Sequence, residues 1–339
     1  MSVVKKCTYS LFFPYLTPEL ILFKHLSLFL LKKLLIGIAA FVALLLLFFG
    51  YTDRSVDDLK EKYASYPSSF VEIDGMQVHF RDEGLKKDTL LPLVLLHGTG
   101  ASLHTFDAWT NELKFQRRIL RMDLPAFGLT GPFPDKDYSI GHYVDFVHKF
   151  LVANGIKRCI LGGNSLGGNI AWQFAVKYPQ MVDKLILIDA AGYPMVSKSS
   201  PIAFRIARIP VLNNLLTFIT PRFMARASVE NVYADEARVS DELVDRYFEL
   251  TLREGNRRAL VDRMQMPLDS TAYQKIKTIQ HPTLILWGEQ DELIPVEAAR
   301  RFQADLPNDT LVLMKNAGHV PMEESPKESL QIVQSFLNQ

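Results

Sequence analysis

Short apolar runs alternate with helical patterns from Phe70 to the C-terminus, and this rhythm constrains the fold more than any other feature of the chain. Strands buried in a parallel sheet read as continuous apolar runs of about four to eight residues. Strands that alternate with helices are typical of α/β proteins with a largely parallel sheet. The runs that predict strands are 70–73, 76–80, 91–96, 119–122, 159–161, 185–188, 284–286 and 311–313. The sequence therefore predicts an α/β protein with a mostly parallel sheet.

Helical patterns with identifiable ends lie between these runs. Ser139 is a typical N-cap and Gly155 a typical residue just past a helix, so they bracket a predicted helix over 139–154. Further helices are predicted at 166–177, 296–305 and 326–337. Helices that connect parallel strands cover both faces of a sheet, so we expect a sheet with helices on both faces.

The alternation is interrupted once, over residues 195–279. No strand pattern occurs there, and the amphipathic segments are 202–209, 211–219 and 241–253. The sequence therefore predicts a helical cap over 195–279, inserted after the sixth strand into a core formed by 70–194 and 280–339. The apolar residues of this cap include Phe204, Leu212, Leu215, Leu216, Phe218 and Phe223. Of these, Leu215, Leu216 and Phe218 are the candidates for a pocket wall.

An uncharged apolar stretch precedes this body. Residues 34–51 (LLIGIAAFVALLLLFFGY) contain no charged side chain and suffice for one transmembrane helix. They do not end in the small-x-small cleavage site of a signal peptide. We predict an N-terminal membrane segment over 1–52 with its span at 34–51, in contact with membrane lipid, and a tether over 53–69.

The charges beside the span predict its orientation. Basic residues concentrate on the cytoplasmic side of a membrane span. Three basic residues lie near each end, but the pair Lys32 and Lys33 abuts the apolar edge, with Lys5 and Lys6 further upstream. We predict a single-pass protein whose folded body lies on the extracytoplasmic side.

Composition excludes several partners. The 38 basic and 37 acidic residues give a net charge of +1, and no basic block occurs, so nucleic acid is not an expected partner. The two cysteines, Cys7 and Cys159, lie in regions of different character and cannot form a disulfide framework or a zinc site. We therefore expect neither metal nor redox chemistry through cysteine.

A serine flanked by glycines is the first candidate for a catalytic residue. The strand run at 159–161 leads directly into Gly163, Ser165 and Gly167, and then into a helical pattern. A serine on so tight a strand-turn-helix needs small neighbours, and the turn lifts its hydroxyl clear at the carboxyl edge of the sheet. Ser165 is therefore the candidate nucleophile.

A serine nucleophile needs a base, and eight histidines are available. His319 follows the last strand run, at the same carboxyl edge as Ser165, and is the candidate base. His97 and His104 share this edge, but His97 precedes Gly98 and is interpreted as a loop-shaping residue. The others lie in the anchor, in a hairpin, on a helix or at the amino end of a strand: His25, His79, His142, His148 and His281.

Two acids compete to orient the base. Asp291 follows the seventh strand and Asp189 the sixth, and both preserve the chain order serine, aspartate, histidine. Asp291 is favoured because its loop neighbours the histidine strand, and Asp189 remains the alternative acid. Asp123, after the fourth strand, is interpreted as part of a structural turn.

Backbone amides complete the candidate site. Leu166, directly after Ser165, and Thr99, after the third strand, are the predicted oxyanion-binding amides. The pair Gly98 and Gly100 also resembles the start of a dinucleotide fingerprint, but Leu103 stands where the third glycine belongs. No Gly-Lys-Ser/Thr phosphate loop occurs either, so no cofactor and no metal is expected.

In combination, these motifs resemble the α/β-hydrolase family, in particular its cap-bearing bacterial branch of carboxylesterases, monoacylglycerol lipases and meta-cleavage product hydrolases. The motifs that carry the resemblance are HGTG at 97–100, DLPAFG at 123–128, GNSLGG at 163–168, GEQD at 288–291 and GHVP at 318–321. The resemblance implies Ser165 as nucleophile, Asp291 as acid, His319 as base, and the Thr99 and Leu166 amides as oxyanion hole. It further implies a cap that walls the substrate pocket.

The implied activity is hydrolysis of a lipophilic carboxylic ester through an acyl-enzyme. The alternative is carbon–carbon bond hydrolysis of a vinylogous diketone by the same three residues. A non-catalytic receptor for a small ligand is a further alternative, but such a protein is expected to lose one of the three residues, and Ser165, Asp291 and His319 are all present.

Overall fold

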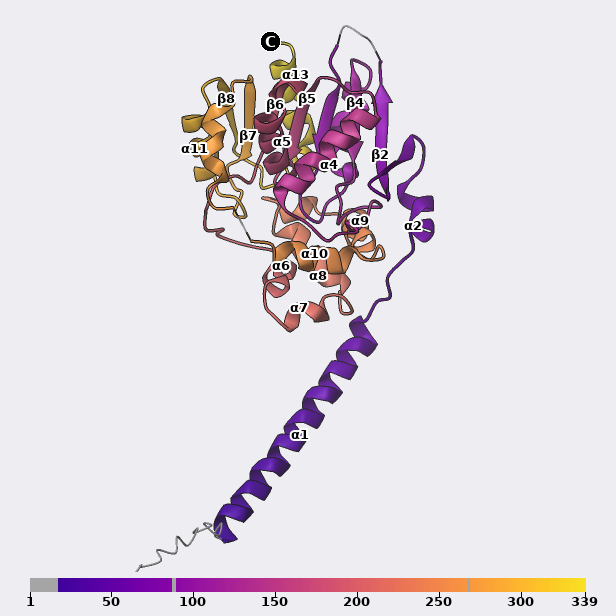
Figure 1. The fold of residues 1–339 in the computed structure, drawn as a ribbon, viewed down its shortest axis with the longest axis vertical. Coiled ribbons are helices and arrows are strands. Elements are labelled where there is room, and N and C mark those ends of the chain that lie inside the picture. The colour runs from indigo at the N-terminus through magenta and orange to yellow at the C-terminus, as the bar shows by residue number, and fades with distance from the viewer. Residues whose placement is uncertain (1–17, 87–89, 268) are drawn as a thin grey trace, which may run out of the picture. The chain divides into compact units, whose positions relative to one another are not determined.

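The computed structural model describes residues 18–86, 90–267 and 269–339. They belong to two compact units that divide between Gly50 and Tyr51. In the first unit, α1 (Pro18–Phe49) is one helix of 32 residues (Figure 1). Its stretch Leu26–Phe49, 24 residues with a mean hydropathy of 2.4, is long and apolar enough to cross a membrane. A signal sequence near an N-terminus meets the same criteria.

The helix differs from the predicted span at both ends. It continues through Lys24, Lys32 and Lys33, because lysine is a good helix former and does not interrupt an α-helix. It ends at Phe49, and Tyr51 belongs to the second unit, where its N–H donates to the carbonyl of Phe218. Residues 1–17, which include Lys5, Lys6 and Cys7, lie outside the described residues.

The segment expected as a tether is folded onto the second unit. It contains α2 (Val56–Tyr63), which begins with a capping box between Ser55 and Asp58. Leu59 and Tyr63 are buried against the body, and the Tyr63 hydroxyl donates to Glu249 over 2.7 Å. The segment was predicted to be a linker because most of its residues are charged or polar. Its apolar face extends over only two helical turns.

The predicted α/β fold is confirmed. One sheet has the strand order β1-β2-β4-β3-β5-β6-β7-β8, and β2 alone runs in the opposite direction to the other strands. Each predicted strand run overlaps one of these strands. The run at 91–96 is the one that starts before its strand, by two residues, since β3 begins at Leu93. The strands are β1 (Ser68–Ile73), β2 (Met76–Gly84), β3 (Leu93–Leu96), β4 (Arg118–Met122), β5 (Cys159–Asn164), β6 (Val182–Ile188), β7 (Thr283–Gly288) and β8 (Asp309–Met314).

Helices cover both faces of the sheet, as predicted. In β3, Val94 and Leu96 face the core under α4 (Ile140–Ala153), α5 (Leu166–Lys177) and α11 (Glu297–Asp305). Leu93 and Leu95 face the other core, under α3 (Asp107–Leu113) and α13 (Pro326–Leu337). Helix α3 was not predicted, because seven residues are too few to reveal a helical periodicity of apolar residues.

Helices also occupy the insertion between β6 and β7, and Figure 1 shows them gathered at one end of the strands. We call residues 195–279 the cap. The predicted helix at 211–219 is reduced to one turn, which begins after Val211 with its positive φ of 71° and ends at Leu215. The cap helices are α6 (Ile202–Ala207), α7 (Leu212–Leu215), α8 (Arg222–Glu230), α9 (Asp241–Thr251) and α10 (Asn256–Met264).

Candidate active site

Ser165 occupies the turn between β5 and α5. Its φ of 55° and ψ of −113° lie in a region that non-glycine residues rarely adopt. A Cβ on Gly163 would lie 2.2 Å from the carbonyl carbon of Gly167, and one on Gly167 would lie 2.1 Å from the carbonyl oxygen of Leu96. Both flanking glycines are therefore required by this turn, which presents Ser165 at the carboxyl edge of the sheet.

His319 and Asp291 form a buried pair at the same edge. The Nδ1 of His319 lies 2.6 Å from Oδ2 of Asp291. The other oxygen of Asp291 accepts the N–H groups of Leu293 and Ile294 at 2.8 and 2.9 Å. Because an aspartate oxygen accepts and Nδ1 donates, Nε2 of the neutral ring is free to accept a proton.

Asp189 lies beside this pair. Its side chain is fully buried, and Oδ1 accepts the N–H of Gly288 over 2.9 Å. Ligand atoms of Asp189, Asp291 and His319 all lie within 4.8 Å of one another, which among the described residues is close enough to hold a metal ion. Two of these three side chains, His319 and Asp291, are already hydrogen-bonded to each other. The structure thus hydrogen-bonds His319 to Asp291, with Asp189 adjacent.

The predicted oxyanion amides flank Ser165. A Cβ on Gly98 would lie 3.2 Å from Cβ of Ser165, so the loop that carries Thr99 passes directly over the serine. Leu166 is the first residue of α5, where helix N–H groups lack intrahelical acceptors. Within the described part of the chain, neither the Thr99 nor the Leu166 amide has an assigned acceptor.

His97 shapes this loop, as the sequence analysis proposed. Its ring is buried; Nδ1 lies 2.8 Å from the carbonyl of Gly98, and Nε2 accepts the N–H of Leu124 at 2.9 Å. Burial lowers the pKa of His97, which favours the neutral ring that this arrangement requires. His97 thus joins the loops after β3 and β4.

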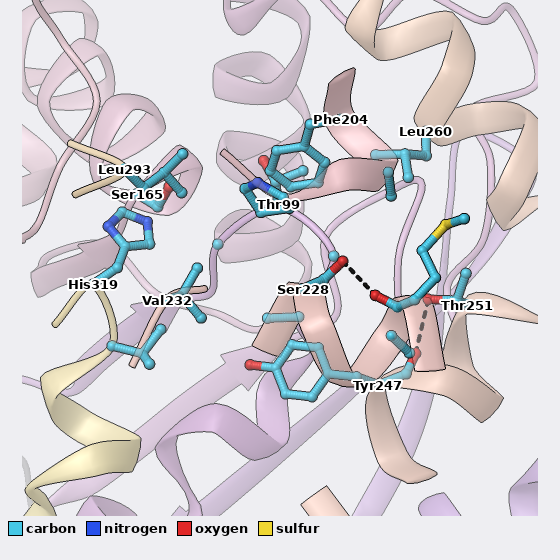
Figure 2. A pocket seen from close by; sticks show the side chains of 18 of the residues that line it. Thr99, Ser165, Phe204, Ser228, Val232, Tyr247, Thr251, Leu260, Leu293 and His319 are labelled. Carbon is cyan, nitrogen blue, oxygen red and sulfur yellow. Dashed lines mark hydrogen bonds between the residues drawn. The ribbon is translucent and has the colours of Figure 1, made fainter. Parts of the chain in front are cut away.

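A pocket opens above Ser165 and His319, between the sheet edge and the cap, and Figure 2 shows both side chains on its wall. Its empty volume is about 830 Å³, the open mouth included. Cap hydroxyls on the wall bond to their own helices: Ser228 donates to the carbonyl of Met224, and Thr251 to that of Tyr247 (Figure 2). The wall therefore offers mainly apolar surface.

The apolar wall comes from other residues than those expected. Phe218 is 61% exposed, and Leu216 packs in a separate cluster inside the cap. Leu215 does not line the pocket either. These residues lie in and just after α7, which Figure 1 shows at the end of the cap far from the strands. The apolar side chains that line the pocket include Phe204, Met224, Val232, Leu260 and Leu293.

Two polar side chains that the sequence analysis did not identify hold the histidine loop. The Asn164 amide donates to the carbonyl of His319 over 2.9 Å, which joins the serine turn to this loop. Glu324 accepts the N–H of Gly318 at 2.7 Å and those of Ala234 and Asp235 at 2.9 Å, which joins the loop to the cap. Only the position of Asn164 next to the serine offered a signal in the sequence.

A second serine–histidine–aspartate chain lies outside the pocket. The ring of His79 bonds Asp123 through Nδ1 at 2.7 Å and Ser68 through Nε2 at 2.9 Å. Ser68 also accepts from Arg81, and neither Ser68 nor His79 lines the pocket described above. Asp123 additionally accepts the N–H groups of Leu103 and Leu129. This chain fixes the turn after β4, in agreement with the structural role expected for Asp123.

The sheet, with a serine on the turn after β5 and a His–Asp pair on the loops after β8 and β7, defines an α/β-hydrolase architecture. The family model for the alpha/beta hydrolase fold matches residues 92–326, and the chain belongs to this family. It is therefore a hydrolase of the α/β fold.

Proteins that are named for different activities are similar to this chain. An uncharacterized hydrolase, YugF, of Bacillus subtilis is 25% identical over 78% of this chain and 96% of its own length. A 2-hydroxy-6-oxo-2,4-heptadienoate hydrolase of Pseudomonas putida is 26% identical over 78% and 93%. The solved structure of a membrane phospholipase A, described as a bacterial virulence factor, is 26% identical, with a TM-score of 0.67 over 92% and 97%.

Proposed function

We propose that this protein is a membrane-anchored serine hydrolase that cleaves a lipophilic carboxylic ester through an acyl-enzyme. One observation carries the proposal: Ser165, on a strained turn, and His319, bonded through Nδ1 to Asp291, line the same apolar pocket. The nucleophile, the base and the acid that orients the base would then have the roles that serine hydrolysis requires.

The reaction proceeds in two steps. Nε2 of His319 takes the proton of Ser165, and the serine oxygen attacks the ester carbonyl. The Thr99 and Leu166 amides stabilise the negative oxygen of the tetrahedral intermediate. His319 then gives its proton to the departing alcohol, which leaves Ser165 acylated. A water molecule, deprotonated by His319, attacks the acyl-enzyme. His319 then returns this proton to the oxygen of Ser165 as the carboxylic acid leaves.

The pocket supports an apolar acyl or alcohol group. Its wall includes Phe204, Met224 and Leu260, and burial of an apolar chain contributes about 0.8 kcal/mol per methylene. The membrane phospholipase A relative, whose name denotes hydrolysis of a lipid ester, supports the same substrate class.

Carbon–carbon bond hydrolysis is the second candidate, favoured by the heptadienoate hydrolase relative. Such a substrate carries a carboxylate, which calls for a cationic partner in the pocket. The residues that line the pocket include no lysine or arginine. This composition supports the ester over the dienoate. The presence of Ser165, Asp291 and His319 together disfavours a receptor without catalysis.

We further propose that α1 is an uncleaved single-pass anchor and that the body lies on the extracytoplasmic side. The apolar stretch Leu26–Phe49 supports a span in contact with membrane lipid. Full-length protein made in a bacterium should stay with membranes in alkaline carbonate, with a mature N-terminus before Leu34. A soluble species that begins near Tyr51 would identify a cleaved signal instead. A reporter that works only outside the cytoplasm, fused after Gln339, should be active, and an inactive one reverses the orientation.

Substrate class is tested by turnover of para-nitrophenyl esters of graded acyl length beside a vinylogous diketone. The proposal expects turnover of the esters, with a preference for chains longer than acetyl. Vigorous turnover of the diketone with a flat response to acyl length would instead assign carbon–carbon hydrolysis. Ser165→Ala is the control, because both activities require the serine hydroxyl.

A further inference from the structure

Asp189 is a buried acid that the two-step mechanism does not use. It directly follows β6, with a positive φ of 43°, and has no exposed surface. Its Oδ1 accepts one hydrogen bond, from the N–H of Gly288. Its Oδ2 is buried without a hydrogen-bond partner in the described structure. An aspartate oxygen in this position is costly if it carries charge, because it is neither solvated nor bonded.

The neighbouring carboxylate is in the opposite situation. Asp291 accepts three hydrogen bonds, from the backbone of Leu293 and Ile294 and from Nδ1 of His319. Three donors stabilise the ionised form of Asp291. Two carboxylates this close and this deeply buried cannot both carry charge at low cost, so one of them holds a proton. The asymmetry in donors places that proton on Asp189.

The groups around Asp189 do not supply a counter-charge. Asp291 faces it from the loop after β7, His319 from the loop after β8, and Glu324 from α12 (Pro321–Glu324). Two of these three are acids, and the one base is already bonded to Asp291. Burial, followed by the charge of Asp291, raises the pKa of Asp189 well above its ordinary value, in agreement with the geometry.

We propose that Asp189 is a neutral carboxylic acid whose Oδ2–H donates to the Asp291 carboxylate, and that it acts as a positioning residue for the Asp291–His319 pair. The inference rests on the proposed function, because it gives Asp291 the role of orienting acid. Asp189 would hold the carboxylate of Asp291 beside His319, while the N–H of Gly288 holds Asp189 itself. Asp189, which the sequence offered as an alternative to Asp291, thereby becomes a residue that supports Asp291.

Infrared spectroscopy reads the proton directly. At neutral pH, the full-length wild-type protein should show the carbonyl stretch of a protonated carboxylic acid, and Asp189→Asn should lack it. The band is read without turnover, so the result is independent of whether Ser165 is the nucleophile. A wild-type spectrum without this band overturns the inference even if the variant does not fold. A band of equal intensity in a folded Asp189→Asn variant also overturns it.

Kinetics then test the positioning role. Asn keeps a side-chain donor, whereas Asp189→Leu has none at similar volume. We expect Leu to lower kcat by about tenfold with little change in KM, and Asn to restore most of the loss. The acidic limb of the pH profile of kcat/KM should be the same in wild type and Asp189→Asn, because no charge is removed. If Asp189 were ionised, its replacement would remove a negative charge beside His319 and move this limb to lower pH, which would overturn the inference.

Discussion

Nδ1 of His319 lies 2.6 Å from Oδ2 of Asp291, and the two residues come from loops that follow the adjacent parallel strands β8 and β7. The pairing of these strands in register, from Gly288 and Met314 backward, brings the two loops to one edge of the sheet. Ser165 leaves β5 at the same edge. Strand register thus assembles a site from three positions far apart in the chain.

Asp291→Asn should lower kcat/KM by about 10⁴-fold, because the neutral amide no longer stabilises the imidazolium and can impose the wrong tautomer on His319. Asp189→Asn should cost only a few-fold. Initial rates on one activated ester, measured for both purified variants, compare the two acids. The reverse order would move the orienting acid to the end of β6.

Glu324→Ala should lower the free energy of unfolding by about 1–3 kcal/mol, because the buried N–H of Gly318 and those of Ala234 and Asp235 lose their acceptor. It should also lower kcat, because the loop of His319 loses a tie to the cap. Glu328→Ala, an exposed acid on α13, is the matched control. Equal stability and kcat in the two variants would remove Glu324 from the support of the loop.

Asp189 should make stability depend on pH in a defined direction. A carboxyl whose pKa is raised in the folded protein contributes stability that is full below its unfolded pKa and is lost as pH rises toward its folded pKa. As pH rises above about 4, the ordinary pKa of an aspartate, wild type should therefore lose stability relative to Asp189→Asn, by at most about 1.4 kcal/mol per pH unit. Denaturant unfolding in detergent micelles, followed by the fluorescence of the buried Trp109, Trp172 and Trp287, measures this difference. A difference that does not change with pH contradicts a protonated Asp189.

Phe204→Ala should move the optimum of ester turnover toward longer acyl chains, because the ring stands on the pocket wall. Each methylene accommodated should raise kcat/KM by up to about fourfold. Phe218→Ala is the control, since Phe218 lies on the outside of the cap at 61% exposure. The ester panel gives both profiles, and parallel shifts in the two variants would assign the effect to the cap as a whole.

The strands were predictable because both faces of the sheet are covered, which makes runs such as 185–188 apolar at every position. The ends of α4 and α5 were predictable from Ser139, Gly155 and the glycine-flanked serine, each of which acts locally. Helices α2 and α3 were missed because one or two turns give too little periodicity. Their stability comes from tertiary contacts, such as those of Leu59 and Tyr63 with the body.

The sequence placed Ser165, Asp291 and His319 at one edge but could not place side chains relative to one another. It treated Asp189 and Asp291 as alternatives, whereas the structure puts them within reach of each other. It also assigned the pocket wall by hydrophobicity, which does not tell an outward Phe218 from an inward Phe204. The positive φ of Val211, at the N-terminus of the short α7, likewise has no signal in the sequence.

The most direct test of the proposed mechanism is the site of modification by a fluorophosphonate, found by mass spectrometry of the labelled full-length protein. The account predicts one stoichiometric adduct on Ser165, which is absent in Ser165→Ala and unchanged in Ser68→Ala, whose serine belongs to the second serine–histidine–aspartate chain. Circular dichroism should show the same fold in all three proteins, because the Ser165 side chain is only partly buried. No adduct on Ser165, or ester turnover by Ser165→Ala within about tenfold of wild type, would contradict a serine nucleophile at this position.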